Sequence, residues 1–138
     1  MRVDGRCHCG AIAYRGEANP AEVSICYCTD CQGLTGSAFR VSVPVSGESF
    51  VLSAGRPKTY VKTAESGARR AQAFCGDCGA PIYSAAEKDP THYMLRVGTL
   101  AQRGELPPRL QIWMRSKPAW VEPVAGIPSF EEEPPKPG

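Results

Sequence analysis

The chain lacks long hydrophobic runs and any stretch that could form a long uninterrupted helix. Its 138 residues include 14 glycines and 13 prolines, which interrupt the sequence too often for a helix to carry the core. The first residues, MRVDGRCHCG, lack the apolar segment of a signal peptide, and no later segment approaches the ~18 apolar residues of a membrane span. We therefore expect a cytoplasmic protein with no membrane partner.

Clusters of basic residues and phosphate-binding loops are also absent from the sequence. Lys and Arg are scattered, and they do not alternate with aromatic residues as they do in many nucleic-acid-binding surfaces. The formal charge of +2 falls to about −1 if all seven cysteines bind two zinc ions as thiolates. The segment GLTGSAF lacks the Gly-Lys-Ser/Thr ending of a phosphate loop. We expect neither nucleic-acid nor nucleotide binding.

Short segments of alternating polar and apolar residues indicate a mainly β fold of antiparallel strands. The clearest is 38–45, AFRVSVPV, in which apolar side chains occupy every second position and Pro44 predicts an edge or a bulge. Short helical turns are expected only around 30–34 and 100–103. Further strands are expected, between Gly, Pro or charged turns, within 11–18, 49–52, 59–63, 69–74, 81–84, 92–100 and 109–116.

The length of the chain predicts a single domain with one core. We place this domain at 1–130. The remaining residues, 131–138 (EEEPPKPG), combine charge with proline and almost no apolar side chains, which is typical of a mobile tail.

Seven cysteines fall into three groups with metal-binding spacing. They are Cys7 and Cys9 in CHC, Cys26, Cys28 and Cys31 in CYCTDC, and Cys75 and Cys78 in CGDC. Residues 7 and 9 of an extended segment point to the same side, so His8 points away from them. A C-x-x-C turn also directs two sulfurs at one ion, so CHC and CGDC together predict a closed four-thiolate structural zinc site. The alternative, a redox C-x-x-C, would need a βαβ context that this sequence does not show.

The CYCTDC group leaves three thiolates for a second ion. Three protein ligands and one open position are typical of a catalytic zinc, whose fourth ligand is a substrate or water. The alternative is a structural site that a distant residue such as His92 completes, although His92 also fits as an ordinary polar residue of a strand. We interpret Trp113 and Trp120 as core or rim aromatics.

The order GRCHCGAIAY, CYCTDCQGLTGSAF, FCGDCGAPIY, VGTL and SKPAWVEPVAGIPSF resembles the glutathione-dependent formaldehyde-activating enzyme (Gfa/CENP-V) family. The resemblance implies an Mss4-like β-tent of antiparallel sheets with two zinc ions per chain. It places the structural zinc on Cys7, Cys9, Cys75 and Cys78, and the catalytic zinc on Cys26, Cys28 and Cys31. It further implies a carbon-sulfur lyase that makes S-hydroxymethylglutathione from glutathione and formaldehyde, with a small thiol and an aldehyde as its partners.

The chain departs from the family at two positions. Relatives often carry a His where this chain has Gln111, and an acidic residue where it has Ala101. Two other functions remain open: a protein that binds glutathione or a small thiol without turnover, and a zinc-stabilised protein-interaction module. The oligomeric state is not predicted. Candidate partners for the carboxylates of glutathione are Arg40, Lys62, Arg70, Arg96 and Lys117.

Overall fold

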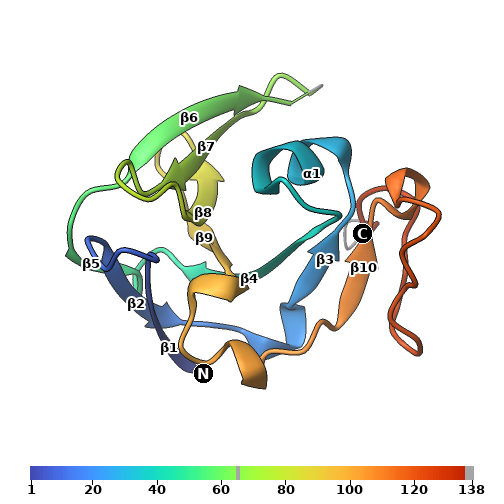
Figure 1. Cartoon of the computed structure of the whole chain (residues 1–138), viewed down its shortest axis with the longest axis horizontal. Helices are drawn as coiled ribbons and strands as arrows, with labels where there is room; N and C mark the ends of the chain where they lie inside the picture. The colour runs from blue at the N-terminus through green and yellow to red at the C-terminus, as the bar shows by residue number, and fades with distance from the viewer. Residues whose placement is uncertain (65, 136–138) are drawn as a thin grey trace.

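A computed structural model describes residues 1–64 and 66–135 and arranges their strands in two sheets (Figure 1). The smaller sheet has the order β1-β2-β5, with bounds Arg2–Arg6, Ala13–Glu17 and Val51–Ala54. The larger sheet has the order β10-β3-β4-β9-β8-β7-β6, with bounds Leu110–Ile112, Ser24–Cys26, Arg40–Ser46, His92–Arg96, Pro81–Ala86, Arg69–Phe74 and Lys58–Thr63. All neighbouring strands are antiparallel except β10 and β3. The predicted mainly β, Mss4-like fold is confirmed, whereas β1 and β3 lie in segments for which no strand was predicted.

Helical structure is limited to short segments. The α-helix α1 spans Thr29–Thr35, at the helical turn predicted around 30–34. In place of the turn predicted around 100–103, one 3-10 helix, η2, precedes residue 100 and another, η3, begins at residue 103. Two further 3-10 helices are η1 and η4. Their bounds are Pro20–Glu22 for η1, Val97–Thr99 for η2, Arg103–Glu105 for η3 and Met114–Ser116 for η4. In the described part of the chain, no helix has the length and apolar character needed to cross a membrane.

Strand β4 occupies the middle of the larger sheet even though it contains Pro44. Its partner β3 pairs only as far as Ser42, so Pro44 lies beyond the end of that ladder. There its carbonyl accepts a hydrogen bond of 3.1 Å from the Asn19 main-chain N–H. Proline has no N–H to donate, so it fits where one neighbour has already ended. The predicted edge therefore applies only to the part of β4 around Pro44, where β3 no longer pairs with it. As a whole, β4 lies between β3 and β9 in the sheet.

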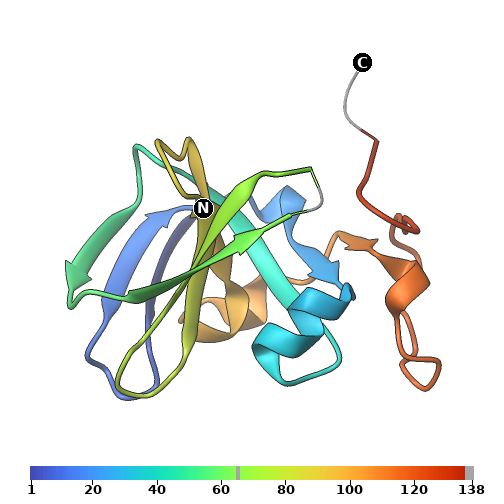
Figure 2. The ribbon, with the colours of Figure 1, turned by 90° about the horizontal axis from the view of Figure 1, so that it is seen from above.

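The two sheets share one hydrophobic core. Alternate residues of β4 contribute Val43 and Val45, which are almost completely buried as the alternation predicted. The smaller sheet contributes Tyr14, whose ring lies 6.0 Å from that of Phe50, and Phe50 stacks on Tyr93 of β9 at 4.4 Å. Figure 2 shows the two sheets side by side from above. Because residues from Val3 to Leu106 enter this core, the sheets form a single packed unit.

The segment after residue 130 is hydrogen-bonded to the segment that follows β10. Trp113 donates its main-chain N–H to the Glu132 carbonyl at 3.1 Å, and Arg115 forms an exposed ion pair with the Glu132 carboxylate at 2.8 Å. The boundary at residue 130 and the mobility of 131–138 stay predictions. Residues 136–138 of that predicted tail lie outside the described residues.

The close approach of β1 to Tyr14 gives a test of the core. A Cβ atom on Gly5 would lie 2.5 Å from Tyr14 Cζ and 2.8 Å from the Thr99 carbonyl oxygen, whereas one on Gly104 would meet nothing within 4 Å. We expect Gly5→Ala to lower the free energy of unfolding by about 1–3 kcal/mol through overpacking, and Gly104→Ala to leave it nearly unchanged. Urea unfolding measures both variants, and equal stability of the two would contradict this packing.

Candidate metal centres and the adjoining pocket

The first cysteine cluster joins two turns that are far apart in the sequence. Cys7 and Cys9 follow β1, and Cys75 and Cys78 lie between β7 and β8, yet all four sulfurs lie within 4.8 Å of one another. The Cys9 sulfur is 3.6 Å from that of Cys7 and 3.7 Å from that of Cys75. Tetrahedral zinc with bonds of ~2.3 Å requires sulfurs about 3.8 Å apart, whereas a disulfide bond is about 2.05 Å long. These four residues therefore fit a tetrahedral metal ion.

The two turns of this cluster are built in the same way. The Cys7 carbonyl accepts the Gly10 N–H at 3.1 Å, and the Cys75 carbonyl accepts the Gly79 N–H at 2.8 Å. Both glycines have positive φ, +83° and +79°, which other residues rarely adopt. In the first turn the Ile12 N–H also donates to Cys7 Sγ at 3.2 Å, a contact that favours the thiolate form. Local turn geometry thus directs the sulfurs toward one point.

The second cluster contains three sulfurs, those of Cys26, Cys28 and Cys31, within 4.8 Å of one another. Cys26 ends β3, and Cys28 caps the N-terminus of α1, where its sulfur accepts the Cys31 N–H at 3.3 Å. Among the described residues, no His, Cys, Asp or Glu adds a fourth ligand to this group. His92, the alternative fourth ligand, is exposed on β9 and lines a different cavity.

A basic side chain lies against the second cluster. Arg40 opens β4 and is the register partner of Cys26. Hydrogen bonds with the Cys26 and Cys28 sulfurs, together with the charge of Arg40, lower the pKa of the Cys31 thiol. Cys31 is also the most buried of the three cysteines, whereas Cys26 and Cys28 are half-buried. The cluster thus holds a thiolate beside a fixed positive charge.

A cavity of about 330 Å³ adjoins this cluster, and Arg40 lines it as well. Arg96 and Gln72 lie among its polar residues. In Figure 1, α1 faces the β6–β7 hairpin across the middle of the molecule, and Lys62 of the hairpin forms an ion pair with Asp30 of α1 at 2.7 Å. The remaining lining residues are mostly apolar or aromatic: Leu34, Tyr60, Ala73, Phe74, Gly79, Pro81 and Tyr83.

The structure brings only two of the five candidate carboxylate partners into this cavity, namely Arg40 and Arg96. Lys62 is engaged by Asp30 beside the cavity. Lys117 donates instead to the Val121 carbonyl at 2.6 Å, in the segment after β10. Arg70 does not line the cavity, although its charge acts on Arg96.

The amide side chains of a half-buried and a buried glutamine hold the cysteine loop in place. Gln32 of α1 donates to the carbonyls of Tyr27 at 2.8 Å and Ser116 at 3.0 Å. The Tyr27 hydroxyl donates to Gln111 Oε1 at 3.0 Å, and Gln111 Nε2 donates to the Val124 carbonyl at 2.9 Å. No spacing in the sequence points to Gln32 or Tyr27, because the contacts of Gln32 with Ser116 and of Tyr27 with Gln111 each cross 84 residues. In the sequence, Gln111 stands out only as a departure from the resembling family.

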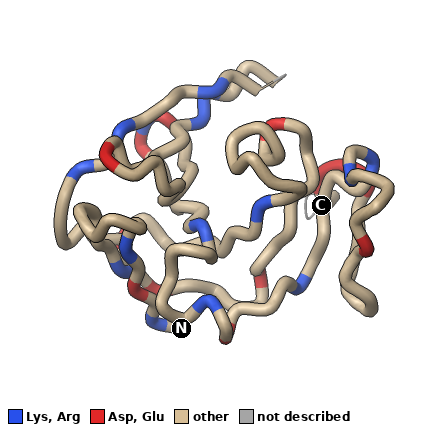
Figure 3. Tube along the Cα trace, viewed as in Figure 1, with Lys and Arg blue, Asp and Glu red and all other residues tan. Residues whose placement is uncertain are grey.

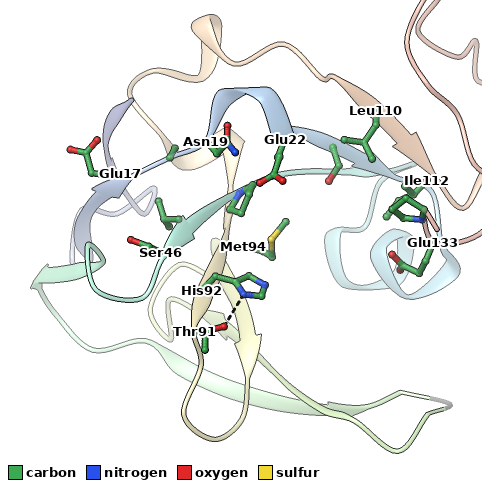
Figure 4. Close-up of a pocket in the computed structure, with 15 residues that line it drawn as sticks. Glu17, Asn19, Glu22, Ser46, Thr91, His92, Met94, Leu110, Ile112 and Glu133 are labelled. Atoms are coloured by element: carbon green, nitrogen blue, oxygen red, sulfur yellow. Dashed lines mark hydrogen bonds between the residues drawn. The ribbon is translucent and has the colours of Figure 1, made fainter. Parts of the chain in front are cut away.

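A second cavity, of about 720 Å³, lies elsewhere and has a different chemistry. Figure 4 shows Glu22 and Glu133 around it, together with His92, whose ring nitrogen Nδ1 is 3.3 Å from Thr91 Oγ1. Neither cavity has a cysteine among its described lining residues. We assign the functional site to the smaller cavity because Arg40, which lines it, also lies against the Cys31 thiol of the three-sulfur cluster.

Gln111 provides a test of this support. It is almost completely buried, so Gln111→Leu leaves the Tyr27 hydroxyl and the Val124 main-chain N–H without their partner. We expect a loss of about 1–3 kcal/mol of unfolding free energy, since buried polar groups that lose a partner bear the desolvation cost. The control is Gln102→Leu, which breaks only exposed hydrogen bonds to Asp4. Equal losses in urea unfolding would argue against the buried network.

Comparison with known proteins places this site in context. Residues 2–116 match the sequence profile of the family described as "Glutathione-dependent formaldehyde-activating enzyme". A Halomonas elongata protein named "Putative glutathione-dependent formaldehyde-activating enzyme" is 27% identical over 131 residues, which cover 88% of this chain and 81% of that protein.

A solved structure shares the fold. The crystal structure of a Rhodobacter sphaeroides protein superposes with a TM-score of 0.57 at 17% identity, over 91% of this chain and 98% of that one. The family profile covers most of the chain, including all seven cysteines. The chain therefore belongs to the glutathione-dependent formaldehyde-activating enzyme family.

Proposed function

We propose that the protein is a zinc-dependent carbon-sulfur lyase that joins a thiol to an aldehyde, with glutathione and formaldehyde as the pair. The observation that carries this proposal is the group of three sulfurs, Cys26, Cys28 and Cys31, which has no fourth ligand among the described residues. A cavity with two arginines lies beside it. The family description and the name of the Halomonas relative support the choice of substrates.

The two clusters receive different roles in this proposal. Cys7, Cys9, Cys75 and Cys78 hold a structural zinc, because four sulfurs complete a tetrahedral site. The three-sulfur cluster holds the catalytic zinc, which when bound supplies positive charge and an open position that lowers the pKa of an entering thiol.

The reaction is an addition without any redox change. The thiol gives up its proton, and its sulfur electron pair forms the new bond to the carbonyl carbon of the aldehyde. The π electrons of the carbonyl move to oxygen, which takes up a proton to complete the S-hydroxymethyl product. The reverse reaction breaks the same carbon-sulfur bond and returns the two substrates.

The chain's own residues have three tasks in this reaction. Cys26, Cys28 and Cys31 would hold the cation, and together with a substrate thiolate they would exceed its charge by two negative charges, which the adjacent Arg40 would partly offset. Tyr27 fixes the cysteine loop against β10, and Gln32 fixes it against the segment that follows β10, so the three sulfurs keep their relative positions. Largely apolar walls around the cavity reduce the access of water to the reacting groups.

The two proposed zinc roles predict different consequences of losing one cysteine. We expect Cys75→Ala to unfold or aggregate, because a structural zinc supplies roughly 10 kcal/mol or more of folding free energy. Cys28→Ala should stay folded and bind one zinc ion fewer. Thermal unfolding and zinc analysis by mass spectrometry measure both effects. Greater damage from Cys28→Ala than from Cys75→Ala would contradict these roles.

Catalysis is tested by exchange NMR on the equilibrium between glutathione, formaldehyde and their adduct. The uncatalysed exchange rate is measured first, because thiols add to formaldehyde without an enzyme. We expect the wild type to increase that rate and Cys28→Ala to leave it at the uncatalysed value. His8→Ala, an exposed change beside the first cluster, is the control and should retain the increase. If the wild type adds nothing to the rate at concentrations that bind all glutathione, non-catalytic thiol binding becomes the better account.

A further inference from the structure

Arg96 is a buried cation without a carboxylate partner. It ends β9, and only 8% of its surface is exposed. Its two terminal nitrogens donate to neutral oxygens, Nη1 to Ser42 Oγ at 2.7 Å and Nη2 to Gln72 Oε1 at 3.0 Å. Its Nε atom has no hydrogen-bond partner. Among residues 1–64 and 66–135, no Asp or Glu oxygen forms an ion pair with it, which is unusual for an arginine this buried.

The surroundings of Arg96 add further positive charge. Burial, together with the nearby charge of Arg40, lowers the pKa of Arg96 to about 9. In Figure 3, most Lys, Arg, Asp and Glu positions lie around the outside of the fold, and few lie toward its middle. The sulfurs of Cys26 and Cys31 supply opposing charge, but a divalent cation bound there reduces the charge of the three thiolates from −3 to −1.

The cavity beside Arg96 has the shape and chemistry of an anion-binding site. Arg40 and Arg96 both line it, and its described lining includes no acidic residue. Leu34, Tyr60 and Tyr83 contribute to its apolar walls, and a low-dielectric wall strengthens the attraction between an arginine and an anion. Ser42 and Gln72 hold the two ends of the Arg96 guanidinium, so its orientation is set before a ligand arrives.

We propose that Arg96 and Arg40 form a carboxylate subsite that selects thiols carrying a carboxylate over neutral thiols. The subsite deepens the proposed function and rests on it, because Arg40 adjoins both the cavity and the cluster that takes the sulfur. A glutathione carboxylate in the cavity supplies the missing counter-charge of Arg96. Its sulfur then lies on the side of Arg40 that faces Cys31. This arrangement makes Arg96 a specificity-determining residue for the thiol substrate.

The test compares three ligands by calorimetry on the zinc-loaded protein. Glutathione has both the thiol and the carboxylates, its diethyl ester lacks the carboxylates, and S-methylglutathione keeps the carboxylates but has no free thiol. We expect the wild type to bind glutathione at least ~10-fold more tightly than the diethyl ester, since charge-assisted hydrogen bonds to arginine are strong. Arg96→Gln should reduce that ratio to nearly one while leaving the affinity for the ester unchanged.

The control variant is Arg15→Gln, which removes the same charge from an exposed position on β2. It should keep the wild-type ratio. Should Arg96→Gln fail to fold, Arg40→Gln provides a second variant on the same cavity, and it too should lower the ratio. A structural role for Arg96 alone would reduce stability without changing the preference between glutathione and its ester.

The outcomes separate this subsite from the lyase reaction. If S-methylglutathione binds the wild type but not the Arg96→Gln variant, the carboxylate subsite is supported, whether or not exchange NMR detects catalysis. Equal wild-type affinity for glutathione and its diethyl ester overturns the subsite and leaves the thiol chemistry intact. Absence of binding by all three ligands overturns both the subsite and the proposed function.

Discussion

The convergence of four sulfurs from two distant turns is the constraint on which the rest of the structure depends. Cys7 and Cys9 belong to the turn between β1 and β2 in the smaller sheet, whereas Cys75 and Cys78 belong to the turn between β7 and β8 in the larger one. A metal ion held by these four sulfurs would join the sheets at one end. Because Cys7 and Cys75 are also members of the hydrophobic core, this junction continues directly into the packed interior.

Interior strands of the larger sheet position the second cluster and the arginines beside it. Strands β3, β4 and β9 are adjacent, so Cys26, Arg40 and Arg96 are brought together from three segments of the chain. The short helix α1 begins at the sulfurs, with Cys28 as its N-cap and Cys31 in its first turn. Its ion pair with the β6–β7 hairpin lies beside the cavity. A cluster of three sulfurs and a pair of arginines therefore lie close together inside the same fold.

The two departures from the resembling family lie outside this cavity. Gln111 is buried and hydrogen-bonded to Tyr27 and Val124. Through Tyr27 it helps to hold the cysteine loop in place. Ala101 donates its main-chain N–H to the Asp4 carbonyl at 2.8 Å, near the smaller sheet. Neither residue lines the pocket that contains Arg40 and Arg96. A substrate preference set by that pocket therefore depends on the arginines rather than on these two positions.

Local sequence patterns determined much of what is described above. Spacings of two and three residues orient neighbouring sulfurs within a single turn, so the division of seven cysteines into four and three was predictable. Strict alternation in 38–45 likewise predicted a strand with Val43 and Val45 inside. By contrast, β1 and β3 were missed, since RVDGR has Val3 as its only large apolar side chain and SIC spans only three residues.

Only the tertiary structure decided which of the scattered basic residues are functional candidates. Five were equivalent in the sequence, but burial and strand order place only Arg40 and Arg96 in the cavity. The contacts of Arg96 cross 54 residues to Ser42 and 24 to Gln72, and Tyr27 meets Gln111 across 84. Such partners depend on which strands pair and on which face each side chain lies. Those relations arise from the packing of the whole chain and leave no signal at short spacing.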